Sequence, residues 1–330
     1  MKRIWSLLFL SLFIVLLVAC SNDDNSDSTS GDTASDEGQN TTQEGGTIKV
    51  GVLASLTGAL ESYGKQTQRG FELGLEHATN GTMEVEKKKI EVVWEDTETK
   101  PEVAVQKATK LLEDDAVDFL VGSSSSGATL AVLPLAEEYE KIMIVEPAVA
   151  DSITGSEFNP YIFRTARNSS QDAYAAAAAI AAEGVKIATF APDYSFGWDG
   201  VSAFKTAAEK LGAEIVLEEY ADPAATDFTS NIQKIVDAEP DYLFVVWAGA
   251  NSPWQQITDM KIQEKGIKIS TGAPDIVALQ LMGPLVGMEG FSVYYHTLPN
   301  NDVNDWLVEE HKKRYNNEVP DLFTPGGFSA

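Results

Sequence analysis

The chain has 330 residues, of which 44% are hydrophobic and 22% charged, a composition typical of a soluble globular protein with two lobes. This composition argues against collagen, a coiled coil and a wholly disordered chain. With 24 Lys and Arg against 50 Asp and Glu, the net charge of −26 does not favour contact with nucleic acid phosphates, so no nucleic acid partner is expected. The single cysteine, Cys20, allows neither an internal disulfide nor a zinc cluster of thiols, and we expect no metal and no cofactor.

The first residues have the profile of an export signal. Lys2 and Arg3 form a short positive region, and residues 4–19 are an uncharged run dominated by Leu, Phe, Val and Ile. The run is shorter than the roughly 20 residues that span a bilayer. It ends in Leu17-Val18-Ala19-Cys20, which resembles a bacterial lipobox, where cleavage precedes a cysteine that carries a diacylglyceryl group. Residues 1–19 are therefore predicted to be a lipoprotein signal peptide and Cys20 the lipidated residue, with an ordinary signal peptide or an N-terminal anchor helix as alternatives.

An acidic segment follows the cysteine. Residues 21–46 contain seven acidic side chains, no basic ones, and many Ser, Thr, Asn and Gly. Such a segment cannot bury enough apolar surface to offset its chain entropy. Residues 20–46 are therefore predicted to be a flexible tether with an r.m.s. span of roughly 28 Å, which leaves a folded body free to rotate above the membrane.

From Thr47 onward, short β-rich runs alternate with helical patterns, which indicates βαβ units and mainly parallel sheets. The first predicted strands are Ile48–Ala54, Ile90–Trp94, Asp118–Val121 and Ile142–Val145. The helices between them are Lys65–Ala78, Pro101–Asp114 and Ala128–Tyr139. An apolar strand-like segment, Pro160–Arg164, follows the loop Ala148–Asn159 and divides this set from the next.

A second set of elements repeats this rhythm. Its predicted helices are Gln171–Ala182, Trp198–Leu211, Phe228–Asp237 and Ser252–Glu264. Its predicted strands are Lys186–Phe190, Glu214–Glu219, Tyr242–Trp247, Ile267–Thr271 and Gly290–Tyr295. We therefore predict an α/β fold of two Rossmann-like lobes, residues 47–160 and 161–297. A last helix, Val303–Tyr315, is expected to return to the first lobe with residues 298–330, so that several crossings form a hinge.

Several short motifs follow one another in a familiar order and spacing. They are Gly51–Gly58 with Tyr63-Gly64, Asp118–Gly127, Phe163-Arg164-Thr165, Asp193–Gly197 and Asp227-Phe228. Over Ile48–Ala330 this order resembles the type I periplasmic binding proteins of ABC transporters, in particular the leucine/isoleucine/valine-binding group. The resemblance implies a cleft between two lobes that closes on a solute. The solute would be a branched-chain amino acid, or a related amide or carboxylate, passed on to membrane permease subunits.

The same resemblance carries two further implications. Such a protein lies outside the cytoplasm, and the lipid on Cys20 would hold it to the outer face of the bacterial membrane. The family normally continues beyond Gly326–Ala330 into another helix and further strands, so the chain looks like a truncated product.

A serine-rich loop is the first predicted part of the ligand site. Ser123–Gly127 follows a strand and precedes a helix, where open α/β sheets bind ligands and helix N–H groups face anions. Ser126 offers a hydroxyl and Gly127 allows close approach; a helix cap is the alternative role of Ser126. The resemblance places Ser126 and the backbone near Ser124 against a ligand carboxylate. It also places Ala148 and Ala150 where the family supplies a backbone carbonyl and a hydroxyl, and Ala150 lacks that hydroxyl.

Three aromatic residues and one acid complete the predicted site. Tyr63 follows the first strand, and Phe196 lies in the corresponding loop of the second lobe, so that opposed rings would bury an apolar side chain. Simple loop packing is the alternative for Phe196. Trp247 ends a strand and faces either the cleft or the core. Asp275 roughly matches the acid that meets the ligand ammonium in the family, and it could equally cap the following helix.

Enzyme activity is not expected. The histidines His77, His296 and His311 do not neighbour a serine motif, and Gly122–Ser126 lacks the closing glycine of a nucleophile elbow. Neither a Walker loop nor Gly-x-Gly-x-x-Gly follows the first strand. The stronger rival is a membrane-tethered sensor subunit of a signalling system, which would use the same closing lobes to report a ligand. The sequence does not separate this role from transport.

Overall fold

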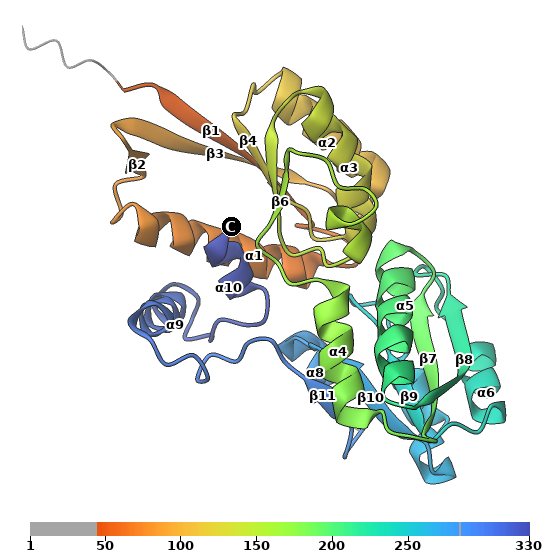
Figure 1. Ribbon diagram of the computed structural model, residues 1–330. Coiled ribbons are helices and arrows are strands. Elements are labelled where there is room, and N and C mark those ends of the chain that lie inside the picture. Colours follow the sequence, from red (N-terminus) through yellow and green to blue (C-terminus); the bar gives the residue numbers. More distant parts are fainter. Residues whose placement is uncertain (1–44, 284) are drawn as a thin grey trace, which may run out of the picture. The chain divides into compact units, whose positions relative to one another are not determined.

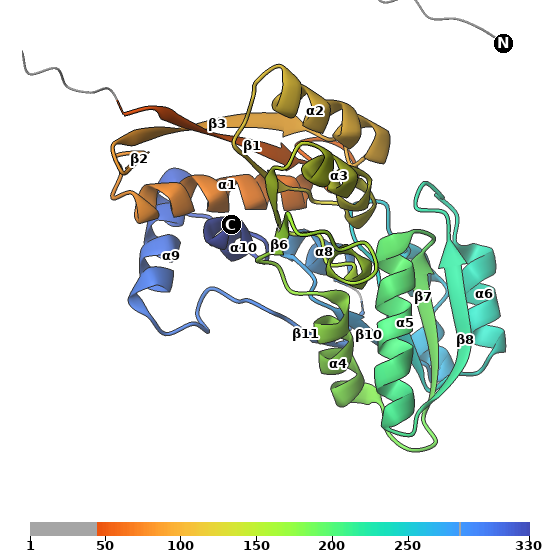
Figure 2. The same ribbon diagram turned by 45° about the horizontal axis from the view of Figure 1, so that its top comes forward.

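The computed structural model describes residues 45–283 and 285–330. The predicted signal peptide, the lipidation of Cys20 and nearly all of the predicted tether lie outside these residues. Two sheets organise the described chain, and each has helices on both faces (Figures 1 and 2). None of the described helices is both long and apolar enough to cross a membrane.

The first sheet has six strands in the order β2-β3-β1-β4-β5-β6. Neighbouring strands are parallel, except for the antiparallel pair β2 and β3. The strands are β1 Thr47–Ala54, β2 Glu84–Val85, β3 Lys88–Asp96, β4 Phe119–Gly122, β5 Ile142–Val145 and β6 Ile162–Arg164. Because β6 pairs with β5, this sheet continues past residue 160, where the sequence predicts the end of the first lobe.

Alternating side chains divide the helices of the first sheet into two layers. Leu53 of β1 packs in one core with α2, Pro101–Glu113, and α3, Ser126–Glu138. Its neighbour Val52 points to the opposite face and packs against α1, Glu61–Ala78. The strands therefore lie between α1 and the pair α2 and α3, as Figure 1 shows.

The second sheet has five parallel strands in the order β11-β10-β9-β7-β8. The strands are β7 Lys186–Pro192, β8 Glu214–Ala221, β9 Tyr242–Val245, β10 Lys268–Gly272 and β11 Glu289–Phe291. On one face lie α4, Ser169–Ile180, and α5, Ser195–Lys210, whose Phe204 stacks on Phe244 with 3.9 Å between ring centroids. The other face is covered by α6 Thr229–Asp237, α7 Trp254–Asp259 and α8 Ile276–Leu281.

The last part of the chain packs against α1. Beyond β11, helices α9, Asp302–Arg314, and α10, Thr324–Ser329, lie beside α1, as both ribbon views show (Figures 1 and 2). The approach of α10 requires glycine in α1, because a Cβ atom at Gly70 would lie 1.9 Å from the carbonyl oxygen of Thr324. The elements of the first sheet are thus completed by residues more than two hundred positions further along the chain.

Most of the predicted elements are present, with ends displaced by up to four residues. The predicted helix Ser252–Glu264 is instead α7 and a separate 3-10 turn, Ile262–Lys265, because Lys261 has a φ of 53° that ends the helical path. The predicted strand Gly290–Tyr295 is hydrogen-bonded only as far as Phe291. Sequence analysis did not predict β2, α8 and α10, since two to six residues are too few to show a periodic pattern.

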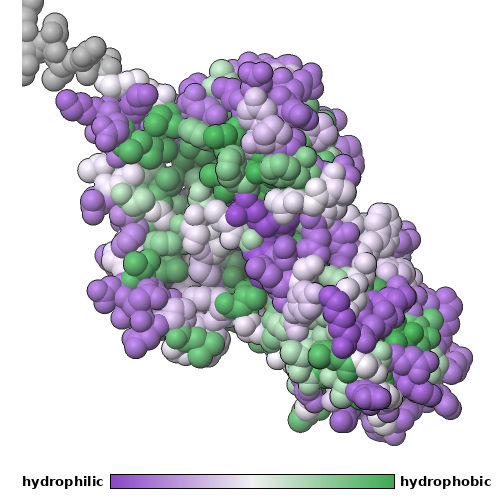
Figure 3. Space-filling model, in the orientation of Figure 1, coloured by the Kyte–Doolittle hydropathy of each residue, from purple (hydrophilic) through white to green (hydrophobic). Residues whose placement is uncertain are grey.

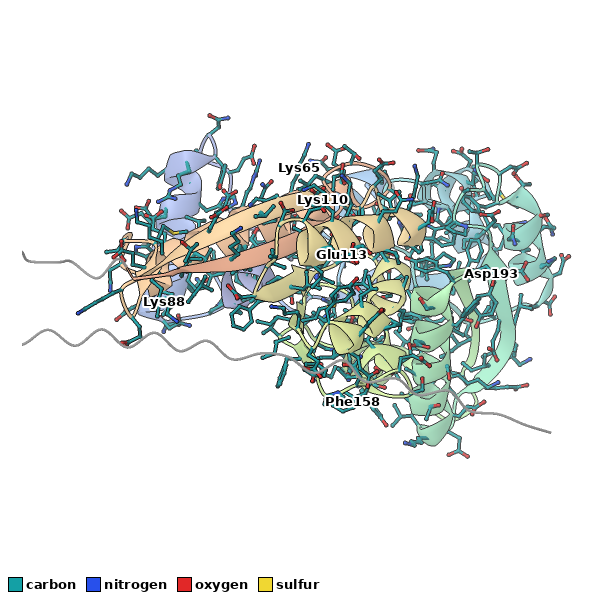
Figure 4. The ribbon with its side chains drawn as sticks, turned by 90° about the horizontal axis from the view of Figure 1, so that it is seen from above. Lys65, Lys88, Lys110, Glu113, Phe158 and Asp193 are labelled. Carbon is teal, nitrogen blue, oxygen red and sulfur yellow. The ribbon has the colours of Figure 1, made fainter. Side chains whose placement is uncertain are left out.

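The outer surface combines matched charges with separate hydrophobic areas. On α2, Lys110 pairs at 2.8 Å with both Glu95 and Asp115, and Glu113 accepts a hydrogen bond from Tyr139 (Figure 4). Hydrophobic residues gather over the first sheet near β1 and β4, and hydrophilic residues follow the margins of that face (Figure 3).

Candidate ligand-binding site

A cavity lies where the strands of both sheets end. Its walls come from segments at or beyond the ends of β1, β4, β5 and β6 in the first sheet and of β7, β9, β10 and β11 in the second. Together with its mouth, it contains about 760 Å³ of empty space. The carboxyl ends of parallel strands are where open α/β sheets bind ligands, so this cavity is the candidate site.

The cavity contains most of the residues that the sequence assigns to a ligand. Those that line it are Tyr63, Ser124, Ser126, Ala148, Phe196 and Trp247. Gly127, Ala150 and Asp275 do not line it. Gly127 lies just behind the wall, since a Cβ atom there would come within 3.7 Å of the ring of Tyr194.

The serine loop presents two hydroxyl groups to the cavity. Ser124 Oγ accepts a hydrogen bond from Ser55 N at 3.0 Å, and Ser126 Oγ accepts one from Ala150 N at 3.2 Å. A hydroxyl that accepts a bond still has its own proton to donate. Ser125, and not Ser126, caps α3, because Ser125 Oγ accepts from Ala128 N. Both cavity hydroxyls can therefore donate to a ligand oxygen.

Arg164 holds both alanine positions that the resemblance assigns to the site. The carbonyl oxygen of Ala148 accepts from Arg164 Nη1 at 3.1 Å, and that of Ala150 accepts from Nη2 at 2.6 Å. Ala150 is fully buried, and its amide is held by Ser126. Burial lowers the pKa of Arg164, and nearby carboxylates oppose this effect. The guanidinium thus fastens the loop after β5 by donating to both carbonyls, each of which keeps a second lone pair.

Aromatic rings form the apolar walls. Tyr63 and Phe323 lie 4.1 Å apart between ring centroids, and Tyr194 and Phe196 lie 5.9 Å apart. Burial raises the pKa of both tyrosine hydroxyls well above the usual range, so each phenol stays protonated at neutral pH. Trp247 lines the cavity and also packs on the core, 5.3 Å from Phe190, so both alternatives for this residue hold.

Asp275 belongs to another part of the molecule. It caps α8 by accepting from Ala278 N at 2.8 Å, and it also accepts from Ser62 Oγ and Gln66 Nε2. Only 1% of its surface is exposed, and it lines a separate cavity next to α1. Capping, the alternative role that the sequence allows, is the one that the structure displays.

Sequence reasoning missed a charged pair in the cavity wall. Arg167 follows β6 and hydrogen-bonds through Nε to both carboxylate oxygens of Asp172, at 2.8 and 3.0 Å. Burial raises the pKa of Asp172, and Arg167 opposes this rise. The missed ring of Phe323 lies 5.9 Å from the guanidinium. Arg167 stands two residues after the motif Phe163-Arg164-Thr165, and this proximity was the available signal. Phe323 has no such signal, because it belongs to the C-terminal segment that returns to α1.

A buried carboxylate lies behind the cavity. Glu146, at the end of β5, is 3% exposed, and burial raises its pKa to about 7 against the opposing influence of Arg167, Thr165 and Arg164. A Cβ atom on Gly326 would lie 1.9 Å from Glu146 Oε1, so α10 packs directly on this carboxyl group. Within the described residues, no cluster of three or more His, Cys, Asp or Glu is arranged to hold a metal ion.

Comparisons with solved structures place this fold among transport-related binding proteins. A crystal structure of an ABC-type branched-chain amino acid transporter from Rhodopseudomonas palustris is 48% identical, with a TM-score of 0.71 over 86% of this chain and 77% of that one. A solute-binding protein of the same species, solved with 3,4-dihydroxybenzoic acid, is 30% identical, with a TM-score of 0.73 over 86% and 78% of the two chains.

Curated relatives are more distant. The Leu/Ile/Val-binding protein homolog 3 of Brucella melitensis is 25% identical over 199 residues, which are 60% of this chain and 53% of that protein. The amino acid binding protein of Pseudomonas aeruginosa is 26% identical over 230 residues, which are 67% of this chain and 58% of that protein. The chain thus spans a little more than half the length of the curated relatives that it matches. Residues 47–330 match the family model described as periplasmic binding protein, and the chain belongs to this family of binding proteins.

Proposed function

We propose that the chain is the solute-binding component of an ABC importer, which captures a small organic solute outside the cytoplasm and delivers it to a permease. The observation that carries this proposal is the cavity at the carboxyl ends of both sheets, lined by three serines and several aromatic rings. Few polar groups in a mainly apolar cavity are typical of small-molecule sites. Membership of the periplasmic binding protein family supports the same role.

The ligand that we propose is an amino acid of the branched-chain type or a related small amide or carboxylate. Ser124 and Ser126 would donate to its oxygens, and Tyr63, Phe196 and Trp247 would enclose its apolar part. A branched-chain amino acid transporter is among the similar structures, which supports the first candidate. Similar structures in complex with 3,4-dihydroxybenzoic acid and benzoate support the carboxylates.

Capture would proceed by closure of two lobes. In this proposal the first sheet through β6, together with residues 298–330, forms one lobe, and the second sheet with its helices forms the other. The chain passes between the sheets after β6 and again after β11, and segments of this kind can act as a hinge. A ligand that touches both walls favours the closed arrangement by its differential affinity for it. The closed form would then dock on the permease.

The location follows from the leader. We propose that Cys20 carries the lipid that anchors the protein to the outer face of the membrane and that residues 20–46 act as the tether. Globomycin, which blocks cleavage of lipoprotein leaders, should then cause the uncut precursor to accumulate. Substitution Cys20→Ser should release the protein from the membrane fraction or leave it unprocessed, and unchanged membrane attachment would contradict the anchor.

Uptake measurements test the importer against its rival. A strain without this gene should lose most uptake of the radiolabelled solute, and a plasmid with the wild-type gene should restore it. A strain that keeps full uptake but loses a transcriptional response to the solute would instead support the sensor, and the importer proposal would fall.

A further inference from the structure

Arg167 lines the candidate cavity and has an unused edge on its guanidinium. The residue lines the cavity, and its side chain is 20% exposed. Its Nε bonds to Asp172, whereas its two terminal nitrogens form no hydrogen bond with any residue in 45–283 or 285–330. The end of a guanidinium presents parallel N–H groups that match a carboxylate. This edge is therefore available for the acid group of a ligand.

The groups that would compensate the charge of an ammonium already accept from arginine or lie outside the cavity. The carbonyl of Ala148 accepts from Arg164, and so does that of Ala150. Asp275 lies outside the cavity and accepts three hydrogen bonds elsewhere. Asp172 is the one acidic residue lining the cavity in the described part of the chain, and both of its oxygens accept from Arg167. An ammonium group entering here would find no free counter-charge.

Two serine hydroxyls of the wall remain free to donate, whereas a third, that of Ser169, gives its proton to Val149 O at 3.0 Å and can only accept. The hydroxyls of Ser124 and Ser126 accept backbone N–H groups and keep their protons for a ligand. Trp247 donates its indole N–H to Asn251 O at 2.7 Å and so presents only its ring. Donors and aromatic rings within one cavity suit a molecule with a carboxylate and an apolar body.

We propose that this cavity selects carboxylates without an ammonium group, and that Arg167 binds the carboxylate. The proposal rests on the proposed solute-binding function and narrows its ligand class. The ring of Phe323, which packs on Tyr63 and lies 5.9 Å from the guanidinium, would shield the pair from water and strengthen its attraction to the anion. Asp172 acts as a positioning residue, because its bonds to Nε orient the free edge.

Two pairs of probes test the ligand class by calorimetry on the full chain. The pair 4-methyl-2-oxopentanoate and leucine shares a carbon skeleton and differs in the ammonium group. The pair benzoate and benzamide differs in the negative charge. Each acid is expected to bind at least 10-fold more tightly than its partner. Leucine or benzamide binding as tightly as the matching acid, or failure of both acids to bind, would overturn the proposal.

Arginine variants test the assigned residue. Arg167→Gln should weaken binding of the better acid about 100-fold, the effect of losing a bidentate charged contact, and Arg167→Lys should restore part of it. Arg69→Gln is the matched control, because Arg69 also pairs with a carboxylate, Glu318, and lies over a ring, Tyr315, outside this cavity. Unchanged affinity in a folded Arg167→Gln variant, checked by circular dichroism, would contradict the assignment.

The outcomes separate this inference from the proposed function. If the acids fail while leucine or another amino acid binds with one-to-one stoichiometry, the solute-binding function stands and the ligand class is wrong. If no amino acid, amide or carboxylate binds, both the ligand class and the proposed solute-binding function are wrong.

Discussion

The ring of Tyr63 lies 4.1 Å from the ring of Phe323, between centroids, although 260 residues separate the two positions in the chain. Tyr63 belongs to α1, and Phe323 immediately precedes α10. The C-terminal return therefore supplies part of the cavity wall as well as the packing of α1. If the cavity binds a ligand as proposed, stability and ligand binding should be coupled through this contact.

Phe323→Ala tests that coupling. Loss of a ring that is 6% exposed should lower the free energy of unfolding by about 3–5 kcal/mol, and it should also weaken ligand binding because Tyr63 loses its support. Urea denaturation and calorimetry measure the two effects. Phe158→Ala is the control, since Phe158 is 56% exposed on a loop and should change stability by less than about 0.5 kcal/mol (Figure 4). Equal effects of the two substitutions would contradict the role of Phe323.

Ser126→Ala separates ligand contact from helix capping. The variant should weaken binding by about 1–3 kcal/mol, through the loss of a hydrogen bond to a charged ligand oxygen. Ser125→Ala should lower the free energy of unfolding by about 1 kcal/mol, because it removes the cap of α3, and leave the dissociation constant unchanged. An unchanged dissociation constant for Ser126→Ala would remove this residue from the site.

Glu146 makes stability depend on pH. Because burial raises the pKa of its carboxyl group to about 7, the folded protein keeps the carboxyl proton at pH values at which the unfolded chain has already lost it. The contribution of Glu146 to the free energy of unfolding is therefore fully present below the pKa of the unfolded chain. It is lost as the pH rises to 7, by about 3 kcal/mol in total. Glu146→Gln carries no charge, so it should exceed the wild type in stability at pH 8 and match it at pH 4.5. Denaturation profiles that stay parallel across this range would refute the assignment.

Gly70→Ala probes the contact between α1 and α10. The added methyl carbon would lie 1.9 Å from a backbone oxygen, so the helices must separate, and the midpoint of thermal unfolding should fall by several degrees. Alanine is otherwise the better helix former by about 1 kcal/mol, which makes a loss of stability diagnostic. Gly46→Ala meets no atom within 4 Å and should leave the midpoint unchanged. A stabilised Gly70→Ala variant would mean that α10 does not pack here.

The alternation of strands and helices was readable because each element is long enough to show its period. Ile142–Val145 is a strand in both the prediction and the structure, and α2 begins at Pro101, as its fixed φ favours. Short elements such as α8 were not predicted, because six residues are too few to show a clear periodic pattern. The helix break at Lys261 depends on the left-handed backbone conformation of this one residue, which no feature of the sequence predicts.

The site was predicted only where local sequence decides it. The loop with Ser124 and Ser126 follows a strand, so its place at the sheet edge could be foreseen. The occupation of the Ala148 carbonyl by Arg164 could not, since it depends on which side chain reaches across from β6. The same applies to Phe323, whose position depends on the packing of a distant helix.

The most direct test of the account is thermal unfolding of the full chain with small carboxylates, amides and amino acids. A ligand that binds only the folded state should add about 2.7 kcal/mol of stability at a concentration of 100 Kd and raise the midpoint accordingly. We expect such a rise for at least one of these compounds, with one molecule bound per chain. If none of them raises the midpoint at millimolar concentration, the cavity does not capture a solute of these classes and the central claim is contradicted.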